Sequence, residues 1–290
     1  MPPDEGLAAL LTRLLGPVAR VEASPHPETT SFPLQQLRVS MRDGSNLELV
    51  LKDTSWAGLS NEAREAKPFF LHDPEREIEL YRRILSATTA GTPEFYGAEG
   101  TLLLIENVEA PVLWQVGELD VWCLVAESLA ALHGELAGHV DDPVLLRYDA
   151  AYYQLWLARA EAFAGPLGVV ASLHEEAVER LLALPQTVIH GELYPSNVLV
   201  EGSRVCPIDW ELAGAGPGLI DLAALATGWT GADQAAIVTA YGDVDADDLD
   251  SCRLHLALRW LGWSRTWSAP KAHARDWLAE AVGAAERLGG

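Results

Sequence analysis

The sequence predicts an α+β protein of two lobes: a small antiparallel β-sheet lobe with one key helix, and a larger, mainly α-helical lobe. Three strand candidates lie near the N-terminus, at residues 18–23, 34–41 and 47–52. An Asp-Gly pair supplies the turn between the last two. From residue 117 onward, apolar residues recur at helical spacing. We therefore expect an N-terminal lobe at 1–108 and a C-terminal lobe at 109–290, with Pro111 at the crossing.

The composition supports a folded chain and limits its partners. Hydrophobic residues make up 49% of the 290 residues, which is enough for a substantial core. The formal net charge is −22, which repels nucleic acid and anionic lipid and attracts cations. A cationic small molecule fits this charge, and so does the simpler interpretation that the charge serves solubility. We expect no nucleic-acid and no membrane partner, and the sequence leaves the oligomeric state open.

The cysteines and the N-terminus favour a cytoplasmic protein. Cys123, Cys206 and Cys252 are odd in number and far apart, so neither a zinc site nor a disulfide framework is expected. The first five residues are acidic and lack the basic and apolar regions of a signal peptide. No uninterrupted apolar run is long enough to span a membrane.

The other elements follow from apolar spacing and capping residues. Leucines on one face predict a helix at 6–15. Asp73 as N-cap and Pro74 at the first helical position predict a second helix that runs to Leu85. The last strand of the small lobe is expected at 101–108. In the larger lobe we expect helices at 121–136, 149–164, 173–184, 219–228, 232–241, 247–267 and 271–287.

The segment from His190 to Asn197 carries the most informative spacing. Glu192 is followed five residues later by Asn197, and Asp209 comes twelve residues after that. Apolar runs on both sides predict short strands that deliver these polar side chains at their ends. Phosphoryl transfer needs a residue that orients or deprotonates the acceptor hydroxyl, and oxygen ligands for Mg²⁺. Glu192 suits the first task, and Asn197 and Asp209 suit the second.

This segment resembles the catalytic loop of the aminoglycoside phosphotransferase and choline kinase family, whose fold is protein-kinase-like. The family pattern is His-Gly-Asp, four residues and Asn, followed by Ile-Asp-Trp or Ile-Asp-Phe. The matching elements here are His190–Asn197 and Ile208–Trp210. Further on, residues 216–223 resemble the family's Gly-Pro-x-x-x-Asp-Leu-Ala segment, whose aspartate is Asp221 here. In the family this aspartate supports the catalytic loop, and the leading histidine is mainly structural.

The resemblance implies a reaction and its cofactors. The γ-phosphoryl group of ATP or GTP would pass to a hydroxyl of a small acceptor. A cationic acceptor such as an aminoglycoside, an amino sugar or an amino alcohol is expected. Mg²⁺ would be held by Asn197 and Asp209, and Glu192 would act on the acceptor.

One position departs from the family pattern, because Glu192 stands where the family has Asp. The two carboxylates have similar pKa values in solution, but glutamate is longer, and a displacement near 1 Å can cost about 10²-fold in rate. Three interpretations follow: an active kinase with a shifted loop, a slow enzyme, or a pseudokinase that binds a ligand or regulates a partner. A protein kinase is a weaker alternative, since the loop lacks the Arg of His-Arg-Asp.

The resemblance also places the nucleotide. Lys52 ends the third strand and matches the lysine that contacts the phosphates. Glu77 matches the helix glutamate that pairs with this lysine, and Glu79 is the alternative. The simpler interpretations are a solvated strand-end lysine and a glutamate on a helix surface.

The loop between the first two strands contains no glycine, although backbone N–H groups usually approach phosphate there. Thr30 and Ser31 offer hydroxyl and backbone donors instead, and an ordinary turn is the alternative. Between the lobes, the backbone from Glu106 to Val108 is expected to bind the adenine edge.

The acceptor site is assigned to Glu211 and Trp263. Glu211 matches a family position that is often acidic, and it either binds a cationic acceptor or orders the loop. Trp263 belongs to a helical stripe with Trp260 and Trp267. Choline kinases use aromatic residues in a comparable region to hold a quaternary ammonium by cation–π attraction. Packing in the core is the alternative for this stripe.

Overall fold

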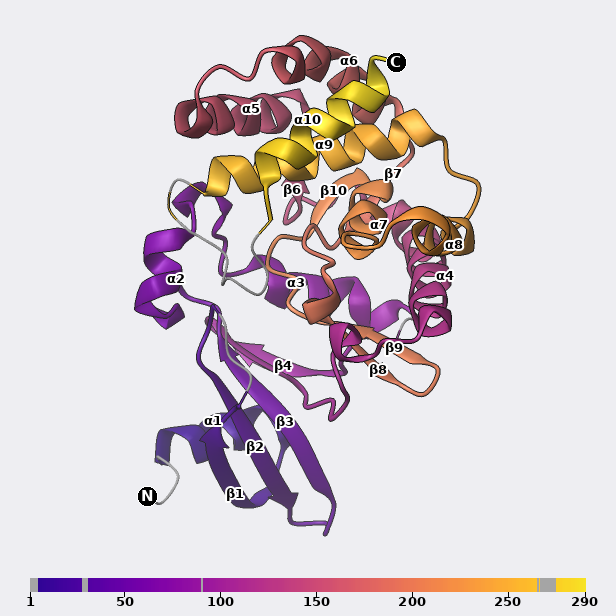
Figure 1. Ribbon diagram of the computed structural model, residues 1–290. Coiled ribbons are helices and arrows are strands. Elements are labelled where there is room, and N and C mark those ends of the chain that lie inside the picture. Colours follow the sequence, from indigo (N-terminus) through magenta and orange to yellow (C-terminus); the bar gives the residue numbers. More distant parts are fainter. Residues whose placement is uncertain (1–4, 28–30, 90, 265, 267–274) are drawn as a thin grey trace.

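A computed structural model describes residues 5–27, 31–89, 91–264, 266 and 275–290. The N-terminal part forms an antiparallel sheet of order β1-β2-β3-β5-β4 (Figure 1). Its strands are β1 (Val18–Pro25), β2 (Leu34–Met41), β3 (Asn46–Asp53), β4 (Phe95–Glu99) and β5 (Leu102–Glu106). The three predicted strands and the turn at Gly44, with a φ of +92°, are present. Strand β4 was not predicted.

Two helices cover the two faces of this sheet. Alternate residues of a strand point to opposite faces, so Leu49 and Leu51 pack with helix α1 (Glu5–Leu15), while Val50 packs with helix α3 (Arg76–Arg83). Lys52 follows the same alternation and points toward α3. The side chain of Lys52 is thus directed between the sheet and α3 by strand periodicity alone.

The C-terminal part is mainly helical, as predicted. Helix α9 (Ala246–Trp263) runs through its centre and is buried along most of its length. Its side chains pack against neighbouring helices in two hydrophobic clusters. The surrounding helices are α4 (Leu119–Leu136), α5 (Ala150–Ala164), α6 (Val169–Ala183), α7 (Leu219–Leu225), α8 (Gly231–Tyr241) and α10 (Trp277–Leu288). The predicted start of the helix at 271–287 lies outside the described residues.

Short strands in the second lobe deliver the polar segment singled out in the sequence. Strand β7 (Gln186–Ile189) pairs with β10 (Gly214–Pro217), which also pairs with β6 (Leu146–Arg147). Strands β8 (Val198–Glu201) and β9 (Arg204–Pro207) form a hairpin. The catalytic segment therefore leaves β7 and enters β8, and Asp209 follows β9.

Helix α2 (Asn61–Ala66) was missed because it buries no residue and so has no apolar periodicity. Local capping marks it instead, since Ser60 accepts a hydrogen bond from the backbone N–H of Ala63. Helix α3 begins later than predicted. Asp73 accepts from the N–H of Glu75 at 2.9 Å, which forms a turn ahead of the helix rather than its cap.

The chain crosses between the lobes after β5. The carboxylate of Glu106 accepts hydrogen bonds from Arg204 at 2.8 and 2.6 Å, and the carbonyl of Pro111 accepts from the N–H of Val200 at 3.0 Å. Within the described ranges, no helix is both long enough and apolar enough to cross a membrane.

Candidate phosphoryl-transfer site

Lys52 lies between two carboxylates at the junction of the lobes. Its Nζ is 2.6 Å from Glu77 Oε2 and 2.5 Å from Asp209 Oδ1. Lys52 and Glu77 are 5% and 2% exposed. The expected Lys52–Glu77 pair is present, and Glu79 instead pairs with Arg82 near the surface. Burial disfavours the charged form of Lys52, but the surrounding carboxylates prevail and raise its pKa.

Asp209 occupies a left-handed backbone conformation with a φ of 66°. Residues other than glycine rarely adopt it, and two contacts hold it here. Lys52 binds the carboxylate of Asp209, and Glu77 Oε1 accepts from the N–H of Trp210 at 3.2 Å. Burial disfavours ionisation of Asp209, but Lys52 and Lys67 outweigh it and lower its pKa. Asp209 therefore stays ionised at a fixed position.

Asp221 holds the start of the catalytic segment. Its carboxylate accepts from the N–H of His190 at 2.6 Å and from the N–H of Gly191 at 2.9 Å, and His133 Nε2 lies 3.3 Å away. Gly191 has a φ of +80°, and a Cβ there would lie 2.5 Å from the hydroxyl of Tyr148. Only glycine fits this close approach.

His190 is buried and structural. Its Nε2 lies 2.8 Å from the carbonyl of Ile208, and its Nδ1 accepts from the N–H of Glu192 at 3.3 Å. Burial lowers the pKa of His190, so the ring is neutral and carries its proton on Nε2. The imidazole thus links the catalytic segment to the segment that carries Asp209.

Glu192 and Asn197 face each other across the loop. Asn197 Nδ2 donates to the backbone carbonyl of Glu192 at 2.9 Å. The side chain of Glu192 is 16% exposed. Burial raises the pKa of Glu192 to about 7, although Arg259 works in the opposite direction. A carboxyl with this pKa gains and loses its proton near neutral pH, where general acid–base catalysis is most efficient.

The residues present fit Mg²⁺. Because Nδ2 of Asn197 is used by Glu192, its Oδ1 remains for a cation, and no described group donates to it. Asp209 adds an ionised carboxylate. The described residues hold no group of three His, Cys, Asp or Glu side chains that could bind a metal. Two oxygen ligands nevertheless suit Mg²⁺, which takes its other ligands from phosphates and water.

The predicted nucleotide residues are only partly described. Thr30 lies outside the described residues. Ser31 is described, and its carbonyl accepts from the N–H of Ser60 at 2.9 Å. The carboxylate of Glu106 is engaged by Arg204, so only its backbone can meet a base. In the described part of the chain, nothing accepts a hydrogen bond from the N–H of Val108.

The two predicted acceptor residues are both engaged by the protein itself. Glu211 is 9% exposed and forms an ion pair with Lys67, which is 8% exposed. Trp263 is 7% exposed, stacks on Trp156 at 5.8 Å, and donates from Nε1 to the carbonyl of Ala66 at 3.0 Å. These contacts agree with the structural alternatives, loop ordering and core packing, and the acceptor role of both residues stays a prediction. Trp267 lies outside the described residues.

Three residues at the site carried no recognisable sequence signal. The ring of Phe32 lies 4.7 Å from Lys52 Nζ and 5.5 Å from Lys67 Nζ. Arg259 is fully buried beneath the catalytic segment. Lys67 follows a polar helix and Arg259 sits in an ordinary helical pattern, so only tertiary contacts reveal them.

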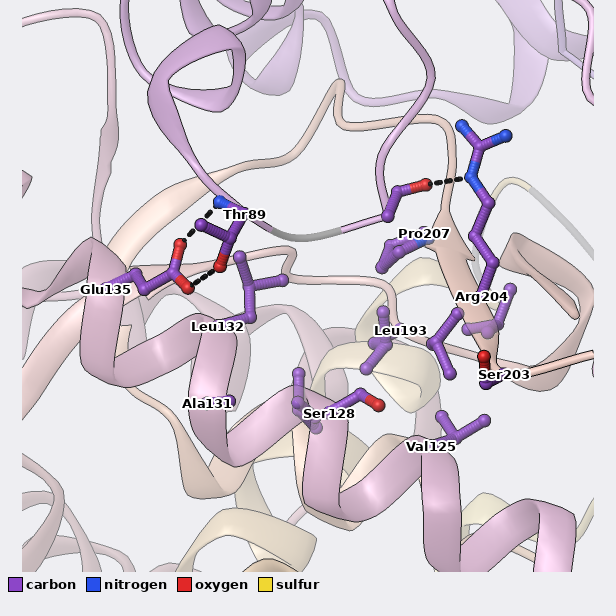
Figure 2. Close-up of a pocket in the computed structure, with 14 residues that line it drawn as sticks. Thr89, Val125, Ser128, Ala131, Leu132, Glu135, Leu193, Ser203, Arg204 and Pro207 are labelled. Carbon is purple, nitrogen blue, oxygen red and sulfur yellow. Dashed lines mark hydrogen bonds between the residues drawn. The ribbon is translucent and has the colours of Figure 1, made fainter.

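A cavity of about 340 Å³ lies elsewhere, between helix α4 and strand β9 (Figure 2). Leu193 and Val198 line it, while Glu135 binds Thr89 at its edge (Figure 2). None of the candidate site residues lines this cavity. The candidate site therefore rests on the polar groups around Lys52 and not on this cavity.

The overall structure is similar to solved small-molecule kinases. Choline kinase LicA from Streptococcus pneumoniae is 14% identical with a TM-score of 0.63, and 98% of each chain is covered. A microcompartment-associated aminopropanol kinase is 16% identical, with a TM-score of 0.63 and coverage of 98% of this chain and 97% of that chain. The GDP complex of aminoglycoside 2′-phosphotransferase-IIIa is 14% identical, with a TM-score of 0.58 and coverage of 98% and 97%.

At these identities the similarity establishes the fold, which is the two-lobe protein-kinase-like fold that the sequence predicts. No curated protein sequence matches the chain. The family comparison is more direct, because the sequence pattern of the "Phosphotransferase enzyme family" matches residues 42–255. This range contains Lys52, Glu77 and the whole catalytic segment. The chain belongs to the phosphotransferase enzyme family.

Proposed function

We propose that this protein transfers the γ-phosphoryl group of ATP or GTP to a hydroxyl of a small acceptor. One observation carries the proposal: Lys52 is bound to both Glu77 and Asp209, from two lobes, beside Glu192 and Asn197. This arrangement supports the proposal, because phosphoryl transfer needs a cation for phosphate, oxygen ligands for Mg²⁺ and a carboxylate base close together.

Each residue then has a task that its environment supports. Lys52 binds the phosphates and is kept in place by Glu77. Glu192 accepts the proton of the acceptor hydroxyl as that oxygen attacks the γ-phosphorus. The bond from the γ-phosphorus to the oxygen that bridges it to the β-phosphate breaks, and ADP or GDP leaves. Mg²⁺, held by Asn197 and Asp209, would neutralise charge on the phosphates. The N–H of Val108, which has no acceptor among the described residues, suits the edge of a base.

The acceptor is proposed to be a small cationic molecule, with the net charge of −22 as the main support. Glu211 cannot supply a free negative charge, because Lys67 already neutralises it. A long-range field rather than that carboxylate would therefore attract the acceptor. The free cysteines Cys123, Cys206 and Cys252 are compatible with our proposal of a cytoplasmic protein.

A pseudokinase is the second candidate function, and the Glu192 position supports it. The carboxylate is longer than in the family pattern and can be misplaced for proton transfer. Such a protein would bind nucleotide or acceptor without turnover.

Calorimetric titration with ATP and GTP, with and without Mg²⁺, tests the proposal. The same samples are followed by ³¹P NMR with aminoglycosides, amino sugars and choline. We expect Mg²⁺-dependent binding and loss of the γ-phosphate signal to one acceptor. Asp209→Ala should abolish both, and retention of both would refute the assignment. Binding without turnover by any member of the panel would favour the pseudokinase.

A further inference from the structure

The guanidinium of Arg259 lies under the catalytic segment, fully buried in helix α9. Its Nη1 donates to the carbonyl of Gly191 at 2.5 Å, and its Nη2 donates to the hydroxyl of Tyr194 at 3.2 Å. The indole N–H of Trp260 donates to the same hydroxyl. Arg259 and Trp260, which are consecutive in α9, therefore bind the loop at Gly191 and Tyr194, on either side of Glu192.

Burial of an arginine is costly unless charge and hydrogen bonds compensate it. Among the described residues, the one carboxylate within ion-pair distance of Arg259 is Glu192, with Oε1 at 4.0 Å from Nη2. The hydroxyls of Tyr148, Tyr152 and Tyr194 and the ring of His255 also interact electrostatically with Arg259. Its Nε has no acceptor in the described part of the chain. Within the described structure, the side-chain hydrogen bonds and the ion pair of Arg259 thus all go to the catalytic segment, to Gly191, Tyr194 and Glu192.

The length of Glu192 matters for this contact. Shortening the side chain to Asp would shift the carboxylate by up to about 1.5 Å, and the distance to Arg259 is already at the limit of an ion pair. Arg259 and Glu192 are therefore a matched pair of charge and length.

We infer that Arg259 is a positioning residue for phosphoryl transfer, which fixes the carbonyl of Gly191 and orients the longer carboxylate of Glu192. The inference rests on the proposed function. Arg259 contacts neither Lys52 nor Asp209 in the described structure, so its loss should affect turnover and leave nucleotide binding unchanged.

The first test separates kcat from binding. Arg259→Lys keeps the charge but loses the planar, two-sided contact, and kcat should fall about 10- to 100-fold. The Kd for Mg²⁺-ATP, measured by calorimetry, should stay within about twofold. Arg253→Lys is the matched control, because Arg253 lies on the same helix and pairs with Asp250; its kcat should equal that of the wild type. An unchanged kcat in Arg259→Lys, or an equal loss of nucleotide binding, would overturn the inference.

A double-mutant cycle tests the pairing itself. If Arg259 acts through Glu192, the effect of Glu192→Asp on kcat should differ by at least about fivefold between the wild-type and Arg259→Lys backgrounds. Independent, multiplicative effects would contradict a matched pair. Should Arg259→Lys fail to fold, Tyr194→Phe removes one of the two loop contacts and should lower kcat with the same unchanged Kd.

A stability cycle needs no acceptor. The shifts in melting temperature caused by Arg259→Lys in the wild-type and Glu192→Gln backgrounds should differ by at least about 2 °C. If the stability effects of the two substitutions are coupled but the wild-type protein shows no turnover, the proposed function and the role of Arg259 in turnover are both refuted. The contact between Arg259 and Glu192 would still stand. Turnover without coupling in either cycle would retain the proposed function and refute the inference.

Discussion

At the scale of single residues, the site consists of opposite charges that hold one another in place. Lys52 forms ion pairs with both Glu77 and Asp209, and all three side chains are removed from most of the solvent. Removing one partner of a buried ion pair lowers the free energy of unfolding by more than the intact pair contributes to it, because the remaining charge stays buried without a partner.

Lys52→Met should therefore lower the free energy of unfolding by about 3–5 kcal/mol and abolish nucleotide binding. Urea unfolding and calorimetry measure the two effects. Arg38→Met is the control, because the Arg38–Glu48 pair is exposed and an exposed pair contributes at most about 1 kcal/mol. Equal losses in the two variants would contradict the buried position of Lys52.

Glu192 predicts an unusual dependence of stability on pH. Its pKa is raised by burial from 4.5 to about 7, so the folded state binds this proton more tightly than the unfolded state does. Ionisation of Glu192 therefore destabilises the fold, increasingly between pH 4.5 and 7 and fully above pH 7.

Glu192→Gln should accordingly stabilise the metal-free protein by about 1–3 kcal/mol at alkaline pH. The gain should shrink as the pH falls toward 4.5, the ordinary value of this carboxyl. Urea unfolding in a chelating buffer at several pH values measures it. A difference that is the same at every pH would show that Glu192 does not titrate as described.

At the scale of elements, helix α7 matters more for the site than its seven residues suggest. Asp221 stands in its first turn and binds the loop through two backbone N–H groups. Helix α9 acts from the other side through Arg259. The catalytic segment is thus held between two helices of the larger lobe.

Asp221→Asn replaces one acceptor oxygen by an amide NH₂ that faces a backbone N–H. A buried donor left unsatisfied costs about 1–3 kcal/mol, and the displaced loop should lower kcat about 10²-fold. The control is Asp245→Ala, which removes the N-cap of α9. It should cost about 1 kcal/mol and leave kcat unchanged. Thermal unfolding and steady-state kinetics compare the two, and comparable kcat values would contradict the supporting role of Asp221.

At the scale of the whole molecule, the site is completed only by contact between the lobes. Lys52 on β3 and Glu77 on α3 come from the sheet lobe, while Asp209, Asn197 and Glu192 come from the helical lobe. A nucleotide that binds both lobes should therefore stabilise the entire fold.

Mg²⁺-ATP at one hundred times its Kd should stabilise the folded state by about 2.7 kcal/mol, which raises the melting temperature by roughly 5 °C. A chelator should remove the shift, and Asp209→Ala should show none. Differential scanning fluorimetry measures it. A full shift in the presence of chelator would remove Mg²⁺ from the proposal.

The sequence alone determined the fold class and the order of the catalytic segment. Strand alternation directed Lys52 toward α3, and apolar spacing located most helices, because these signals lie within one element. The Lys52–Glu77 pair was predicted from the family resemblance. Helix α2 and strand β4 were not predicted. Helix α2 buries no residue, and propensity alone does not distinguish a strand as short as β4 from a loop.

Only the tertiary structure decided what surrounds the catalytic segment. Glu211 is neutralised by Lys67, and Trp263 packs in the core, where the sequence had placed both at the acceptor. Arg259 reaches Gly191 from 68 residues away in the chain. Such contacts depend on how helices pack, and neither residue type nor spacing within one element encodes them. The physical reason is that burial and counter-charge, which set whether a polar group binds a ligand or its own protein, arise only when distant segments meet.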